Sequence, residues 1–282
     1  MELGRNKYYQ GFKYLVYLLL AFNVVAFLLQ AIRGAEITHS GGVGLGDIIV
    51  AYADPIDTAA WLVLLLMLEL ETYILDDEKL TGPLYWTINA INALCYAIIV
   101  YSFFGYLGML EVTGGFAAYS GADACRLIGS GATYVDTIDE YVPIVAENCG
   151  ALASGALHNA ELDLFATPEK FKLLSNLVWL DIINSAVWLV VVTVLQLEVY
   201  LKSSKLFGTT FFKAYKFGKF GLYAILAMAC ILWTIWGNAL DAWDAFLWLL
   251  AFFFIEMNLL DWQKELFEER AENAPDAGMG VA

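Results

Sequence analysis

Acidic residues recur at fixed distances from three tryptophans in three long apolar stretches. The tryptophans are Trp61, Trp188 and Trp248. An Asp stands seven residues before each tryptophan, and an Asp or Asn stands four residues before it. A Glu or Gln follows eight residues after the tryptophan, and a Glu or Asn follows ten residues after it. The acidic members of these columns are Asp54, Asp57, Glu69, Glu71, Asp181, Glu198, Asp241, Asp244 and Glu256. Carboxylates on apolar helices are typical of groups that bind or relay cations within a membrane.

The acid that follows each tryptophan is predicted to lie deep in its helix. A helix rises about 1.5 Å per residue, so roughly 18 Å separate Asp57 from Glu69, whereas the hydrocarbon core is about 30 Å thick. If Asp57 lies at one interface, Glu69 lies inside the membrane, as do Glu198 and Glu256. Inserting a carboxylate at that depth costs about 3 kcal/mol, so such a group usually faces the protein interior or a water-filled cavity. The alternative is a neutral Glu that is hydrogen-bonded to a neighbouring helix.

The other columns also have purely structural interpretations. An Asp at a helix start often caps the helix and aligns with its dipole, and a Trp one turn further in is typical of the aromatic belt at a membrane surface. At about 100° per residue, the last two columns lie about 80° to either side of the tryptophan face. They cannot both point at one axis, so we expect one to line a cavity and the other to contact an adjacent helix.

The composition indicates which elements hold these columns. The 282 residues are 60% hydrophobic and only 16% charged, which is typical of helical membrane proteins. We predict an all-α integral membrane protein with six transmembrane helices, arranged as three hairpins, with a pseudo-threefold repeat of the even helices. The predicted spans are residues 14–33, 56–75, 84–109, 173–201, 219–238 and 243–261. The first span is expected to stay in the mature protein as a signal anchor.

The predicted spans divide the chain into four regions. Residues 1–110 hold the first three helices and a short outer loop, residues 111–172 an extracytoplasmic loop or cap, residues 173–262 the last three helices, and residues 263–282 an acidic tail. With the N-terminus inside, cytoplasmic segments carry eleven Lys and Arg and outer segments four. This asymmetry favours cytoplasmic termini, in the cytoplasmic (plasma) membrane.

The long outer loop contains two cysteines, Cys125 and Cys149. Cysteines that share one extracytoplasmic loop predict a disulfide, which stabilises a loop of this length by about 3 kcal/mol. His158 lies in a polar stretch and is expected to be solvated. Cys95 and Cys230 fall within spans and are interpreted as small hydrophobic residues.

Charge elsewhere in the chain limits the possible partners. The net charge of −15 disfavours nucleic acid and anionic partners and would concentrate cations, although it could equally reflect solubility or a saline habitat. The basic and aromatic residues 202–218 favour contact with an anionic leaflet of the lipid bilayer. Expected partners are therefore the bilayer, cations, and other membrane subunits or further copies of the chain.

Two functions follow from these patterns. The chain has no nucleotide-binding, zinc-protease or nucleophile-elbow motif and no cysteine cluster, so we expect no enzyme activity, no cofactor and no metal centre. The first hypothesis is a cation channel or cation-coupled transporter that uses the acids of the repeated helices. The alternative is a non-catalytic accessory or scaffold subunit of a larger membrane complex. A cavity that reaches Glu69 or Glu256 would favour transport, and acids that face lipid would favour the subunit; an intramembrane enzyme with paired carboxylates ranks last.

Overall fold

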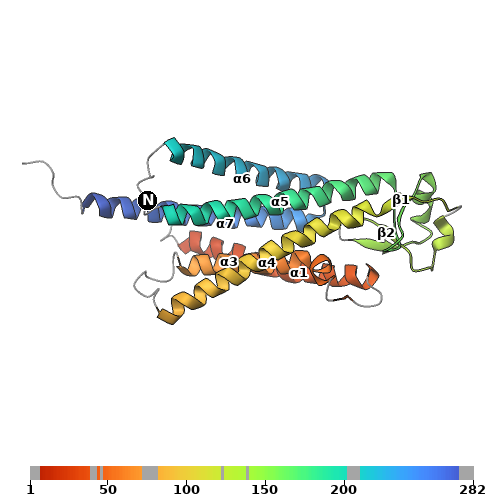
Figure 1. Cartoon of the computed structure of the whole chain (residues 1–282), viewed down its shortest axis with the longest axis horizontal. Coiled ribbons are helices and arrows are strands. Elements are labelled where there is room, and N and C mark those ends of the chain that lie inside the picture. The colour runs from red at the N-terminus through yellow and green to blue at the C-terminus, as the bar shows by residue number, and fades with distance from the viewer. Residues whose placement is uncertain are drawn as a thin grey trace, which may run out of the picture.

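Long helices run side by side along the molecule in the computed structural model, which describes residues 7–38, 43–44, 47–71, 82–121, 124–137, 140–201 and 210–272. A small cap covers one end of the bundle (Figure 1). The helices are α1 (Lys7–Thr38), α2 (Ile48–Ala51), α3 (Ala53–Glu69), α4 (Gly82–Gly114), α5 (Pro168–Leu201), α6 (Thr210–Trp236) and α7 (Ala239–Glu272). We call the two ends of the bundle the cap end and the opposite end.

The six long helices form a closed ring. Each packs against two neighbours in the order α1, α3, α4, α5, α6, α7, and α7 returns to α1. Helices α3, α5 and α7 carry the acidic columns and alternate in this ring with α1, α4 and α6. The main buried cluster includes apolar side chains from both sets, such as Leu20 of α1, Leu64 of α3 and Val191 of α5. The ring therefore places the repeated columns of three helices close to one another.

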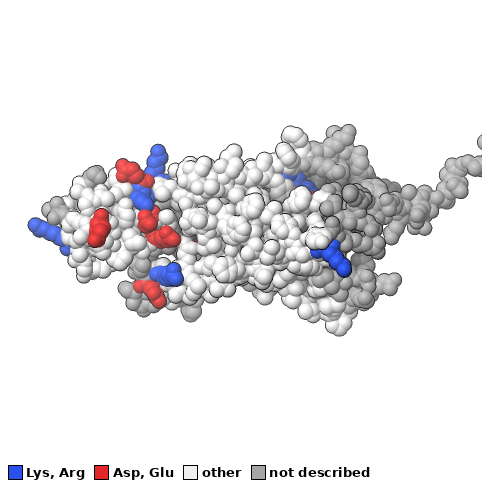
Figure 2. All heavy atoms as spheres, turned by 180° about the vertical axis from the view of Figure 1, so that it is seen from behind, with Lys and Arg blue, Asp and Glu red and all other residues white. Residues whose placement is uncertain are grey.

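Four of the described helices are long and apolar enough to cross a membrane. Their candidate spans are Lys7–Glu36, Gly82–Gly114, Pro168–Val194 and Phe217–Trp236. Large apolar side chains are exposed on them, including Leu18 at 67%, Leu94 at 61% and Phe220 at 72%. Figure 2 shows, on one face, a broad band without charged side chains between the two ends. Such a band suits contact with lipid, because charged groups are costly there, and the protein is an integral membrane protein on these grounds.

A close approach between α2 and α4 occurs at a glycine of α4. A Cβ built on Gly105 of α4 would lie 2.7 Å from the backbone oxygen of Ile49 in α2. Any side chain at this position would push the two backbones apart, and small residues at helix contacts are what permit such approach. The segment around Ile49 belongs to residues 34–55, which were predicted to be a loop. Instead α1 continues to Thr38, α2 forms, and α3 begins at Ala53.

The cap contains a five-stranded sheet, so the expectation of an all-helical chain is wrong for this region. The strands are β1 (Phe116–Ala118), β2 (Thr133–Val135), β3 (Tyr141–Pro143), β4 (Leu157–Asn159) and β5 (Leu164–Ala166). Their order is β1-β4-β5-β2-β3; β2 and β5 are parallel and the other pairs antiparallel. Strands of three residues are too short to show a period-two pattern, which is why the sequence did not indicate them.

The predicted disulfide between Cys125 and Cys149 is present. It links two short 3-10 helices, η4 (Ala124–Leu127) and η5 (Cys149–Ser154). The expectation for His158 is corrected: its ring stacks on Phe165 with centroids 4.1 Å apart, and its Nε2 lies 3.0 Å from Asp163 Oδ1. Both residues are parts of the sheet region, so His158 packs within the cap and is not simply solvated.

The cap joins the bundle at the start of α5. Thr167 caps this helix, because its Oγ1 accepts a hydrogen bond of 3.1 Å from the Lys170 backbone N–H. The Lys170 side chain also donates to Asp136 Oδ1 at 2.6 Å. At the other end of the chain, α7 continues to Glu272, so the first part of the predicted acidic tail is helical. Residues 72–81 and 273–282 lie outside the described residues.

Candidate functional site

The tryptophans of the three repeated columns meet at one level of the bundle. The ring centroids of Trp61 and Trp188 are 5.9 Å apart, and those of Trp61 and Trp248 are 6.3 Å apart. Trp61 and Trp248 are each only 7% exposed. The aromatic-belt interpretation is therefore wrong for these residues, because they pack against one another inside the protein. We call this group the tryptophan layer.

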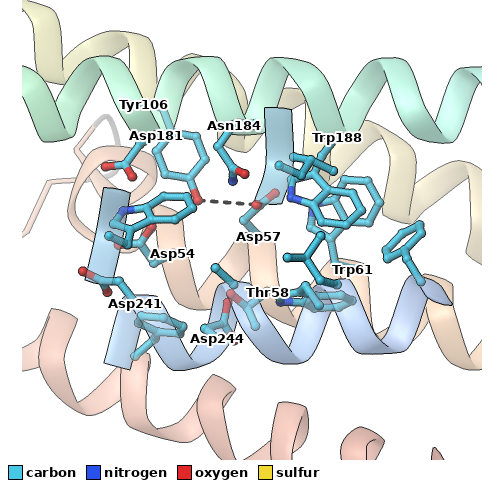
Figure 3. Close-up of a pocket in the computed structure, with 18 residues that line it drawn as sticks. Asp54, Asp57, Thr58, Trp61, Tyr106, Asp181, Asn184, Trp188, Asp241 and Asp244 are labelled. Carbon is cyan, nitrogen blue, oxygen red and sulfur yellow. Dashed lines mark hydrogen bonds between the residues drawn. The ribbon is translucent and has the colours of Figure 1, made fainter. Parts of the chain in front are cut away.

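A cavity lies on the cap side of the tryptophan layer. It has a volume of about 90 Å³ and is lined by 18 residues, drawn in Figure 3. All five Asp side chains of the repeated columns line it. These are Asp54 and Asp57 of α3, Asp181 of α5, and Asp241 and Asp244 of α7. Residues from helices far apart in the sequence thus converge on one space.

The polar residues occupy two levels of the cavity (Figure 3). Asp54, Asp181 and Asp241 form an outer level, and Asp57, Asn184 and Asp244 form a second level between it and the tryptophan layer. This order follows from the helical rise, since the columns precede the tryptophan by seven and four residues, or about 10 and 6 Å.

Hydrogen bonds from the other helices hold the second level in place. Tyr106 of α4 donates to Asp57 Oδ2 at 3.4 Å, and Asn23 of α1 donates through Nδ2 to Asp244 Oδ1 at 2.7 Å. The indole of Trp61 also interacts with the Asp57 carboxylate. The remaining oxygen, Asp57 Oδ1, is buried and has no hydrogen-bond partner of normal geometry in the described part of the structure. A buried acceptor without a partner is costly, so this atom suits a ligand that donates a hydrogen bond.

The charges around the cavity are of one sign. No Lys, Arg or His is among the described residues that line it. The described residues contain no group of three or more His, Cys, Asp or Glu arranged to hold a metal ion. A buried carboxylate needs a proton, a cation or several hydrogen bonds. The arrangement can therefore attract and hold a positively charged ligand.

The Glu columns do not reach this cavity. Glu69 of α3 accepts a hydrogen bond from Lys13 Nζ of α1 and a second from Tyr17 Oη at 3.3 Å. Lys13 is completely buried, whereas the Lys and Arg distribution predicts it among the cytoplasmic charges. Glu71 accepts a hydrogen bond of 3.3 Å from Asn92 of α4. The last two columns of α3 thus contact the two helices that flank it. The angular positions predicted that one of them would line a cavity, but neither lines this one.

The corresponding acid of α7 has the same kind of environment. Glu256 accepts hydrogen bonds from Lys219 Nζ at 2.7 Å and from Tyr223 Oη at 2.9 Å, both on α6. In both sites, the Lys and Tyr are four residues apart on the preceding long helix. Glu198, the candidate on α5, has a side chain outside the described part of the structure.

Sequence reasoning missed the contributions of α1, α4 and α6. Three aromatic residues from these helices, Phe27, Tyr106 and Trp233, line the cavity. Each of these aromatic residues lies fourteen residues after a Lys or Asn of the same helix. A Tyr follows that Lys or Asn after four residues. The three series are Lys13, Tyr17 and Phe27; Asn92, Tyr96 and Tyr106; and Lys219, Tyr223 and Trp233. The spacing relates α1, α4 and α6 to one another in the sequence itself, as the acidic columns relate α3, α5 and α7.

Comparison with known proteins gives no further assignment: no protein-family model, no curated protein and no solved structure matches this chain.

Proposed function

We propose that the protein binds a cation in the carboxylate-lined cavity and couples this binding to transport across the membrane. The observation that carries the proposal is that five Asp side chains surround one cavity whose described lining includes no basic residue. Removing carboxylates from water without a counter-charge is strongly unfavourable. A bound cation would offset that cost, so the apo state is predisposed to accept one.

The proposed architecture has six membrane-spanning helices built from three related hairpins. Two features support it: the closed ring of long helices, and the contact among the three tryptophans that mark equivalent positions. The matching series on α1, α4 and α6 extend the relationship from α3, α5 and α7 to whole hairpins. With both termini cytoplasmic, as the Lys and Arg distribution favours, the cap and the cavity face the exterior.

A cation-coupled transporter fits the cavity better than an open channel. The lining residues extend away from the cap only as far as Phe252, one turn beyond Trp248. Beyond the tryptophan layer, buried apolar residues such as Leu65 and Ala251 continue the packing. A cation could therefore pass beyond the tryptophan layer only after the helices rearrange. Such a rearrangement is characteristic of a carrier with alternating access.

The accessory-subunit alternative receives less support. It expects acids that face lipid, ready to pair with a basic residue of a partner. The acids of the repeated columns whose side chains the structure describes instead line the cavity or contact α1, α4 and α6. The transport hypothesis also loses one of its expectations, because the cavity does not reach Glu69 or Glu256. The aspartates, not the glutamates, are the proposed cation-binding groups.

The test uses the purified chain in detergent and in liposomes. The thermal stability of the wild type should rise with cation concentration, because a ligand that binds only the folded state stabilises it by RT ln(1 + [L]/Kd). The double variant Asp57→Asn with Asp244→Asn keeps the side-chain shapes but removes two charges from the cavity. It should lose most of this stabilisation and most cation flux into liposomes.

The matched control is Glu147→Gln, which removes a charge from an exposed position in the cap. Its cation response should equal that of the wild type. An unaltered response in the double aspartate variant would contradict the proposal and return the accessory-subunit hypothesis to first place.

A further inference from the structure

The cavity has two chemically different parts. Carboxylates of Asp residues surround its cap side, whereas its deep side is formed by the tryptophan layer. Aromatic side chains make up a large share of the lining. They are Phe27, Trp61, Tyr106, Trp188, Trp233, Trp248 and Phe252. A ligand that fills this space must satisfy negative charge on one side and aromatic carbon on the other.

We infer that the ligand is a small organic ammonium ion whose N–H groups contact the Asp carboxylates and whose apolar part packs on the tryptophan layer. This inference rests on the proposed cation-binding function and names the ligand class. Ammonium groups and adjacent methylene groups are attracted to aromatic faces, and Trp is the strongest partner among the aromatic residues. An alkylammonium ion has a charged end and an apolar end. The carboxylates of the cavity suit the charged end, and the indoles suit the apolar end.

The size of the cavity agrees with such a ligand. Its volume is about 90 Å³, and since a water requires roughly 15 Å³ of such space, it has room for about six waters. An alkylammonium ion with a short chain occupies a similar volume. A bare inorganic cation would leave most of the space to water that faces the aromatic rings.

The second level of the cavity further limits which class of ammonium ion can bind. Asp57 Oδ1 is buried without a hydrogen-bond partner of normal geometry in the described residues. A primary or secondary ammonium can donate an N–H to this oxygen, whereas a quaternary ammonium has no donor. Hard inorganic cations prefer a shell of six or more oxygen ligands, which the indole side of the cavity does not offer. The geometry therefore favours an ammonium with N–H groups and a short apolar chain.

The first experiment compares simple probes on the wild-type protein in detergent. Chlorides of n-butylammonium, tetramethylammonium, ammonium, sodium and calcium are titrated at constant ionic strength, with thermal stability and tryptophan fluorescence as the two readouts. We expect n-butylammonium to bind at least about tenfold more tightly than ammonium, because its methylene groups are buried. It should also bind more tightly than tetramethylammonium, which cannot donate to Asp57.

The second experiment tests the aromatic contact. Trp188→Leu removes one ring of the tryptophan layer and keeps an apolar side chain, whereas Trp188→Phe keeps a ring. We expect the Leu variant to weaken n-butylammonium binding about tenfold with ammonium binding within about twofold of wild type, and the Phe variant to lie between. Trp243→Leu is the matched control, since Trp243 is 43% exposed and does not line the cavity.

Three outcomes decide the inference. Preferential binding of n-butylammonium that depends on Trp188 supports it. If sodium, calcium or ammonium binds as tightly as n-butylammonium in the wild type, the inference is overturned while the proposed cation-binding function stands. If none of the probes binds, both are overturned. Because the probe comparison needs only the wild type, a variant that fails to fold does not remove the test.

Discussion

Lys219 of α6 and Glu256 of α7 form an ion pair of 2.7 Å, with their side chains 14% and 19% exposed. Lys13 of α1 and Glu69 of α3 form the corresponding pair, at 0% and 3% exposure. In each case a Tyr four residues after the Lys donates to the second oxygen of the Glu. Both pairs join the two long helices of one hairpin, at the end of the helices away from the cap.

The first prediction concerns the more buried pair. Glu69→Gln removes the carboxylate that accepts from the buried Lys13 Nζ, so we expect it to lower the free energy of unfolding by about 3 kcal/mol. Glu256→Gln should cost less, because Lys219 lies nearer the surface. Thermal unfolding of the purified proteins in detergent measures both effects.

A rescue variant distinguishes the effect of the charges of Lys13 and Glu69 on stability from the effect of their side-chain packing. Replacing both partners, in Lys13→Met with Glu69→Met, removes both charges and should restore most of the stability, since apolar residues of similar volume often substitute well for a buried ion pair. If Glu69→Gln alone unfolds at the wild-type temperature, the ion pair does not stabilise the bundle.

The second prediction concerns the contact between α2 and α4. Gly105→Ala places a methyl group within 2.7 Å of the Ile49 backbone oxygen, so one of the two segments must move. We expect a lower unfolding temperature, by several degrees. Gly221→Ala in α6 is the matched control, because a Cβ there meets no atom within 4 Å; it should be neutral or slightly stabilising, as Ala favours the helix over Gly. Equal effects of the two substitutions would show that the close approach is unimportant.

Much of the cavity could be predicted from the sequence because its aspartates and tryptophans occupy fixed columns in three apolar helices. The same spacing places Asp57 and Trp61 on one helical face, so their convergence required only that the three helices pack together. The disulfide between Cys125 and Cys149 was predictable for a similar reason, since the loop contained no other cysteine.

The ion pairs between helices could not be predicted, because they depend on how far one helix is shifted along the other. Lys13 and Glu69 are 56 positions apart, and nothing in the periodicity of either segment indicates that they meet. The sequence alone therefore assigns Lys13 to the cytoplasmic charges and Glu69 to a cation pathway. The cap sheet was missed because each strand, such as Thr133–Val135, has only three residues and is paired through contacts distant in sequence.

The third prediction concerns the disulfide of the cap. Cys125 and Cys149 should not react with an impermeant maleimide until the protein is reduced, because they are bonded to each other. Replacing both with Ser should destabilise the cap by about 3 kcal/mol, since the bond closes a loop of 24 residues and restricts the unfolded chain. Mass spectrometry of labelled peptides identifies the sites, and limited proteolysis reports the stability of the cap. Labelling of both thiols without reduction would contradict the structure.

The last prediction concerns the pH dependence of cation binding. A cation favours the charged form of each carboxylate that it contacts, so binding must displace any protons that the carboxylates hold. Bound protons compete with the cation, and the affinity should therefore fall as the pH falls, by up to about tenfold per pH unit for each proton displaced. The titratable groups that line the cavity are Asp54, Asp57, Tyr106, Asp181, Asp241 and Asp244.

Calorimetric titration with n-butylammonium in two buffers of different ionisation enthalpy measures the protons released at each pH. The wild type should release protons, and the double variant Asp57→Asn with Asp244→Asn should release fewer, because two of the proton-binding groups are absent. Glu147→Gln should release as many as the wild type, since its carboxylate is an exposed group of the cap. An affinity that stays constant from about pH 5 to about pH 8, with no proton release, would contradict this prediction, because it would mean that the cavity carboxylates hold no protons for the cation to displace in that range.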